Sequence, residues 1–372
     1  MLIFFQKKHP MSWLKEELKK GAAVQKPVNL SDEEKGILDQ VKRETKEWNL
    51  NNVTRTKAYL DFYRQHPEVH WAFLAHMVSR NGGWNMTDLK GEILSRLLSD
   101  REKHSFFSFL ERGNWLIFQD AYPQLLIYRE SLKRNRPLFS LFSHLNISFF
   151  METVWSCFWR RPDPYILTTA FIINEQNYIE KRVLQSSFYK HEVFHKLEFK
   201  LQELLSLNHI LFPFEKNGAI HLKGQTVNHF ESLHERILLG KKLYNVLFKD
   251  KEVLTLTEQW ANTQPHTGSR KDYWPHIFND VHEGVPGEQY QFQLKSCRIR
   301  PGGRRIYSPS LESAWKNVNQ PEAESGDWFE NEHVLEYFLE LDDVINGEIR
   351  HAYCQTLERL ELAALAKKAM WN

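Results

Sequence analysis

The chain has 372 residues, of which 42% are hydrophobic and 13% aromatic, so it can bury a substantial core. Its formal net charge of only +2 argues against a nucleic-acid partner, because that kind of binding needs concentrated positive charge. No run of about 18 uncharged apolar residues occurs, so no membrane-spanning helix is expected. The three cysteines, Cys157, Cys297 and Cys354, form no C-x-x-C pair, which argues against a disulfide scaffold and favours a reducing, cytoplasmic compartment.

Residues 1–50 are expected to be a peripheral segment with a leading helix. Either Met1 or Met11 could be the true start. Trp13, Leu14 and Leu18 among lysines indicate a short amphipathic helix, and Ser31 begins a capping box for a helix that ends near Trp48. Together with the aromatic-rich residues 138–159, this helix raises the alternative of weak membrane-surface contact. A solvated terminus and core packing of 138–159 are the interpretations that we favour.

We predict that residues 51–372 form a single, mainly α-helical domain, because apolar residues recur at helical spacing along most of this range. Short β-hairpins interrupt it near 209–222, around Asn217-Gly218, and near 290–307, around Pro301-Gly-Gly. In the second hairpin we expect Ile306-Tyr307 to be the return strand. The amphipathic C-terminal helix is a candidate homodimer contact.

The stretch from His70 to Leu89 predicts two helices separated by a break at Gly82-Gly83, since glycine readily ends a helix. In the same way, Gly113 is expected to end one helix and Asn114 to begin the next. Polar side chains gather around the first break, where free backbone groups also lie. They predict a ligand-binding pocket at the 80–88 helix junction, formed by His76, Arg80, Asn81, Trp84, Asn85 and Asp88. The alternative is that they only cap helices.

Two further polar groups are candidate sites. Asn174, Glu175 and Gln176 interrupt an apolar helix, so they must be exposed or hydrogen-bonded within the core, and they are a second candidate for the wall of a ligand-binding cavity. Arginines and glycine-turn amides near 298–305 could bind a phosphate or carboxylate; the alternative is a solvated hairpin. The arginines of this candidate anion site are Arg298, Arg300, Arg304 and Arg305.

His191 and His195 belong to an H-E-x-x-H sequence, the pattern that places two zinc ligands on one helix face and leaves Glu192 to activate water. This spacing makes a metal-dependent hydrolase an alternative function. Lys196 and the absence of a recognisable third-ligand motif favour an ordinary polar helix face instead. Zinc is expected only under the hydrolase alternative, and otherwise no cofactor is expected.

Residues 70–76, 79–89, 118–123 and 173–179 resemble the YppC-like proteins of Bacillus-type bacteria, a family of unknown function. The resemblance covers most of the chain beyond residue 45. It implies a bacterial cytoplasmic protein and supplies no activity, cofactor or catalytic residue. The function expected from the sequence is therefore a helical protein that binds a ligand or partner.

Overall fold

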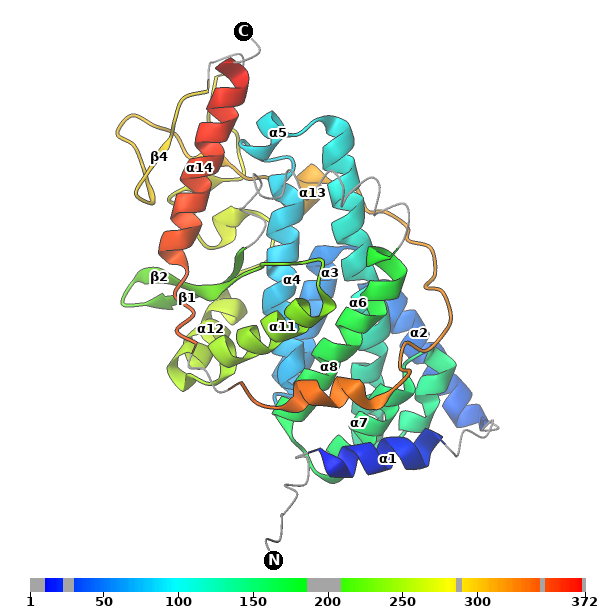
Figure 1. Cartoon of the computed structure of the whole chain (residues 1–372). Coiled ribbons are helices and arrows are strands. Elements are labelled where there is room, and N and C mark those ends of the chain that lie inside the picture. The colour runs from blue at the N-terminus through cyan, green and yellow to red at the C-terminus, as the bar shows by residue number, and fades with distance from the viewer. Residues whose placement is uncertain (1–10, 23–29, 186–208, 286–289, 342–344, 370–372) are drawn as a thin grey trace, which may run out of the picture.

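The structure is a computed structural model that describes residues 11–22, 30–185, 209–285, 290–341 and 345–369. It confirms a mainly α-helical fold with small β elements (Figure 1). No helix among the described residues is both long and apolar enough to cross a membrane.

Two helices precede residue 50. The first, α1 (Ser12–Ala22), buries Leu14 and Leu18 and contacts α7 (Phe149–Arg160). The second, α2 (Asp32–Trp48), begins with the predicted capping box, in which Ser31 and Glu34 bond to each other's backbone N–H. Its buried face packs against α6 (Asp100–Arg134). Both helices therefore contribute to the same hydrophobic core as the rest of the chain.

The central helix is α4 (His70–Asp88), which packs against α3 (Asn52–Gln65), α6, and α8 (Pro164–Ile179) (Figure 1). It runs without interruption through both glycines, so the predicted break at Gly82-Gly83 is wrong. The glycines serve close packing instead. A Cβ on Gly83 would lie 2.6 Å from Nε2 of His266, and one on Gly82 would lie 3.2 Å from Oδ1 of Asn114.

The predicted helix end at Gly113 is also wrong, because α6 continues through it to Arg134. A Cβ on Gly113 would meet nothing within 4 Å, and the side chain of Asn114 donates back to the Leu110 carbonyl at 2.8 Å within the same helix. Packing against α2, α3, α4 and α8 stabilises this helix and outweighs the low helix propensity of glycine.

The aromatic-rich residues 138–159 belong to the core, as favoured from the sequence. They form η1 (Phe139–Leu145) and α7, and most of their rings are buried. Trp155, for example, is fully buried and donates to Oε1 of Gln124 at 3.0 Å. Between α4 and α6 lies the short α5 (Leu94–Leu97).

The first predicted hairpin is confirmed. Strand β1 (His209–Lys216) pairs antiparallel with β2 (Ala219–Thr226), and Asn217 and Gly218 make the turn at positive φ. The helices α11 (Leu233–Phe248) and α12 (Lys251–Thr263) follow, and β1 packs on α12.

For the second hairpin, the prediction of Ile306-Tyr307 as the return strand is wrong. Strand β4 (Leu294–Lys295) pairs with β5 (Arg298–Ile299), across a turn in which Ser296 and Cys297 have positive φ. Ile306–Tyr307, which is β6, instead runs parallel to β3 (Phe278–Asn279). Strand β6 therefore pairs with β3, which is distant in the sequence, and not with the neighbouring strand as predicted.

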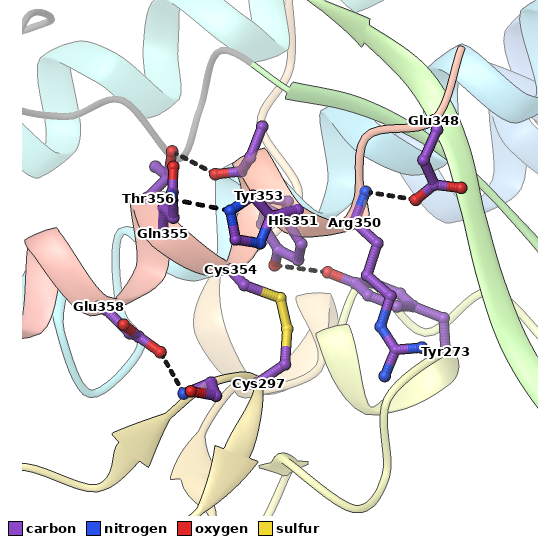
Figure 2. Close-up of a disulfide and its surroundings, with 12 residues drawn as sticks. Tyr273, Cys297, Glu348, Arg350, His351, Tyr353, Cys354, Gln355, Thr356 and Glu358 are labelled. Atoms are coloured by element: carbon purple, nitrogen blue, oxygen red, sulfur yellow. Dashed lines mark hydrogen bonds between the residues drawn. A yellow bond between two sulfur atoms is a disulfide. The ribbon is translucent and has the colours of Figure 1, made fainter. Parts of the chain in front are cut away.

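The C-terminal helix α14 (Arg350–Ala369) lies beside the β4–β5 hairpin (Figure 1). A disulfide joins Cys297 of that hairpin to Cys354 of α14, with 5.4 Å between their Cα atoms (Figure 2). Cys157 is free and buried. The sequence did not reveal the pairing of Cys297 with Cys354, because the two residues are 57 positions apart.

The remaining short elements are η2 (Glu180–Leu184), η5 (Arg270–Asp272), α13 (Leu311–Ala314) and η6 (Glu332–Phe338).

Candidate ligand-binding cavity

Arg80, a central residue of the predicted pocket, is buried against the C-terminal end of α12. It donates hydrogen bonds to the backbone carbonyls of Gln264 at 2.5 Å and Ala261 at 3.3 Å, and it lies over the ring of Trp260. Its Nε donates to His76 at 3.0 Å. Burial lowers the pKa of Arg80 to about 10, and burial beside this arginine holds the pKa of His76 well below its usual value. The cation therefore caps carbonyls that a helix end leaves free.

The other polar side chains of α4 also have internal partners. Asn81 exchanges two hydrogen bonds with the backbone of Leu211 in β1, at 2.8 and 2.9 Å. Trp84 donates to Asp272 at 3.4 Å. The structure thus brings the predicted residues together on one helix, where they attach α4 to β1 and to residues 261–272.

Asn85 and Asp88, the last two predicted residues of α4, also hold this helix against residues 261–272. Asp88 forms an ion pair with Arg270, and Asn85 accepts a hydrogen bond from the same guanidinium at 3.3 Å. These contacts satisfy the polar atoms internally, in agreement with the packing rule for buried polar groups.

A cavity of about 250 Å³ lies on another face of α4. Its wall is formed by α3, α4, α6, α8 and α11, with contributions from η2 and β1. Leu184 and Ile210, which flank the stretch 186–208 outside the described residues, both lie on this wall. Most of the lining is apolar and aromatic, and includes Tyr59, Trp71, Leu74, Val78, Phe109, Ile117, Phe230, Leu239 and Leu243.

Of the three polar residues predicted in α8, one lies in the core and two line this cavity. Asn174 is fully buried, donates to Oδ2 of Asp120 at 2.5 Å, and accepts from the indole of Trp328 at 2.7 Å. Glu175 and Gln176 instead lie on the cavity wall. Successive residues of a helix point about 100° apart, so adjacent positions reach different surroundings.

Glu175 is the carboxyl group of the cavity wall. Burial raises its pKa to about 7; hydrogen bonds from Gln176 and Trp71 oppose this rise, and the charge of Asp120 adds to it. The side-chain amide of Gln176 donates to Glu175 at 3.3 Å. The group therefore keeps its proton to a higher pH than an ordinary glutamate, and it can donate a hydrogen bond when protonated and accept one when ionised.

Two arginines of the wall were not among the residues predicted from the sequence. Arg55 is buried and pairs with Glu111 at 2.5 Å. Arg236 donates to Gln176 at 2.9 Å and pairs with Glu180. The i, i+4 spacing of Arg55 and Tyr59 could have indicated a shared face of α3, but nothing in the sequence relates α3 to α11.

Three of the four arginines of the predicted anion site have separate partners. Arg305 pairs with Glu283 at 2.5 Å, Arg304 lies 3.7 Å from Glu92, and Arg300 stacks on the ring of Phe292. Arg298 is exposed on β5. Anion binding by these four residues stays a prediction, and the nearby carboxylates compete for two of them.

His191 and His195 lie outside the described residues, so zinc binding by the H-E-x-x-H sequence stays a prediction. Within the described ranges, no three histidine, cysteine, aspartate or glutamate side chains are grouped closely enough to hold a metal ion.

Residues 47–352 match the family described as "Protein of unknown function (DUF2515)". The chain belongs to this family. It is also 43% identical, over 236 residues, to the uncharacterized protein YppC of Bacillus subtilis (strain 168), an alignment that covers 63% of this chain and 72% of that protein. No solved structure matches the chain. Every cavity residue named above lies within the part that matches DUF2515.

Proposed function

We propose that this DUF2515 protein binds a small molecule with a largely apolar body in the cavity between α3, α4, α6, α8 and α11. The observation that carries the proposal is the wall itself, in which aromatic and aliphatic side chains surround a few polar groups. Binding sites for small molecules typically have this composition, because apolar surface supplies affinity and a few polar atoms fix orientation.

The size of the cavity supports a ligand rather than a packing defect. About 250 Å³ is much more than the roughly 30 Å³ that one water occupies in the liquid. It is slightly below the range of about 300–1,000 Å³ that is usual for ligand pockets, so the ligand should be small.

The end of α8 supports the same location. The helix changes to π-helical geometry at Glu180–Leu184, where the N–H of Gln185 bonds to the Glu180 carbonyl at 2.9 Å. Val183 and Leu184 of this turn are part of the cavity wall. Such turns occur frequently at functional sites, because they redirect side chains within a helix.

This proposal places the ligand on a different face of α4 from the junction expected at 80–88. The polar atoms of Arg80 and Asp88 are engaged by α12 and Arg270, whereas Leu74 and Val78 on the same helix line the cavity. A ligand at 80–88 would have to displace these buried contacts, and one in the cavity would not.

Isothermal titration calorimetry with 2-phenylethanol, a small neutral probe, tests the proposal. We expect the full chain to bind it and Val78→Phe to lose at least tenfold in affinity, because the new ring fills the cavity. Val281→Phe is the matched control, since Val281 is 66% exposed and outside the cavity wall. Circular dichroism would verify that each variant folds, and Leu239→Phe fills the cavity from α11 if Val78→Phe does not fold. Failure of the wild-type chain to bind this probe and both of the charged analogues used below, or equal binding to the folded cavity variants, would overturn the proposal.

A further inference from the structure

The charge on the cavity wall is unbalanced. Glu175 forms no ion pair with any described residue, and its hydrogen-bond partners, Gln176 and Trp71, are both neutral. The charged group that acts on it is another carboxyl, Asp120 of α6, which raises the pKa of Glu175 further. Tyr59 of α3 is uncharged at neutral pH, because burial and the charge of Glu175 raise its pKa. Glu175 is only partly buried, and it lacks the cationic partner that a carboxylate shielded from water ordinarily needs.

The positive charges on the wall are already compensated. Arg55 is matched by Glu111, and Arg236 is matched by Glu180 and also donates to the Phe230 carbonyl at 2.7 Å. The Nε of Arg55 makes no hydrogen bond, a feature that would favour an anionic ligand. The ion pair with Glu111 neutralises that arginine, however, so the uncompensated charge facing the cavity is that of Glu175 in its ionised form.

Aromatic rings complete the recognition of a cation. Tyr59, Trp71 and Phe230 belong to the same wall as Glu175. Aromatic faces attract positive charge, most strongly where water is excluded. The ring of Phe230 already has one such contact, because the guanidinium of Arg236 lies 5.5 Å from its centre.

We infer that the ligand is an organic cation, a protonated amine attached to an apolar body, and that its ammonium group binds the carboxylate of Glu175. This inference rests on the proposed function and specifies the chemical class of its ligand. The apolar body lies against Leu74, Val78 and Leu243, and the ammonium group supplies the charge that Glu175 lacks. A neutral ligand would leave the carboxylate unpaired, and an anion would be repelled by it.

Three probes with the same ring and different head groups test the inference: 2-phenylethylamine, 2-phenylethanol and phenylacetate. Calorimetry on the full chain at pH 8 keeps Glu175 ionised and the amine protonated, because alkyl amines have a pKa of about 10. We expect the amine to bind at least tenfold more tightly than the alcohol, and phenylacetate to bind most weakly. In Glu175→Gln, the affinity for the amine should fall at least tenfold, and that for the alcohol should change less than twofold.

The matched control is Glu152→Gln on α7. Burial also raises the pKa of Glu152, but this residue lies outside the cavity wall, so both affinities should stay unchanged. If the alcohol or phenylacetate binds as tightly as the amine, the inference is overturned and the binding function stands. If none of the three probes binds, both fail. The comparison of probes on the wild-type chain decides the matter even if Glu175→Gln does not fold.

Discussion

Buried Arg270 and partly buried Asp88 form an ion pair across 182 residues of sequence, in which Nε of the arginine lies 2.7 and 2.9 Å from the two carboxylate oxygens. The same guanidinium donates to the hydroxyls of Tyr273 and Tyr353 at 2.8 Å each. Arg270 therefore connects the last turn of α4 to η5 and α14. Figure 2 shows Tyr273 and Tyr353 together beside the disulfide.

Removing one member of this pair should destabilise the fold strongly. Arg270→Met leaves the partly buried carboxylate of Asp88 without its charged hydrogen-bond donor, which should cost about 2–3 kcal/mol of unfolding free energy. Urea denaturation followed by circular dichroism measures the change. The control is Lys35→Met, which breaks the exposed pair of Lys35 with Asp32 and should have little effect. Equal effects of the two substitutions would contradict the structural role of Arg270.

Two glycines in helices should respond oppositely to alanine. Gly83→Ala places a Cβ against the buried side chains of Asn52 and His266, so we expect a loss of about 1–3 kcal/mol from overpacking. Gly36→Ala in α2 meets nothing within 4 Å and should gain about 0.5–1 kcal/mol, because alanine loses less backbone entropy. Thermal and urea unfolding test both variants. A stabilising Gly83→Ala would mean that α4 does not pack as described.

The buried carboxyl of Asp120 should make stability fall as pH rises. Burial raises its pKa from 3.8 to about 7, opposed by Asn174, Gln124 and Arg182 and assisted by Asp327. Between about pH 4 and 7 the folded state thus keeps a proton that the unfolded state has released. Stability should fall by up to about 1.4 kcal/mol per pH unit from this group, and Glu175 adds a change of the same sign.

Asp120→Asn tests this dependence. One oxygen of Asp120 accepts from both Asn174 and Gln124, and the other has no partner, so an amide can keep the first contacts. The variant should show a smaller decline of stability from pH 4 to 7 and exceed the wild type at pH 8. Urea midpoints at several pH values measure this. Parallel curves for the two proteins would contradict the buried, protonated state.

The disulfide should stabilise the fold without being needed for it. Under non-reducing conditions Cys297→Ser is expected to lose about 2–4 kcal/mol, because the bond closes a long loop in the unfolded chain. A reducing agent should lower the stability of the wild type to that of the variant and leave both folded. A reducing compartment, which the sequence favours, would keep the pair as thiols.

Hydrogen bonds explain why the reduced protein should stay folded. Glu361 of α14 accepts from the backbone N–H groups of Gln293 and Leu294 at 2.7 and 2.9 Å. Glu358, labelled in Figure 2, accepts from the backbone N–H of Ser296 at 2.5 Å. Thiol titration of the unreduced protein should find only Cys157. Three reactive thiols, or unfolding on reduction, would contradict this prediction.

Local patterns in the sequence determined the elements whose signals are local. Helical periodicity predicted a mainly α fold, Ser31 with Glu34 marked the start of α2, and Asn217-Gly218 marked the β1–β2 turn. Each depends on residues a few positions apart, so each can be read without the rest of the chain. The placement of residues 138–159 in the core followed from their polar interruptions.

Tertiary packing decided the rest. The glycines of α4 resemble a helix end until Asn52 and His266 are seen beside them, and Ile306 pairs with Phe278 rather than with its near neighbours. The sequence indicated the polar residues of α4 and those of α8 as two candidate binding sites. Which of them bond internally and which line the cavity depends on α11, α12 and Arg270, which come much later in the sequence. The partner of a buried polar atom is set by the fold and not by spacing along the chain.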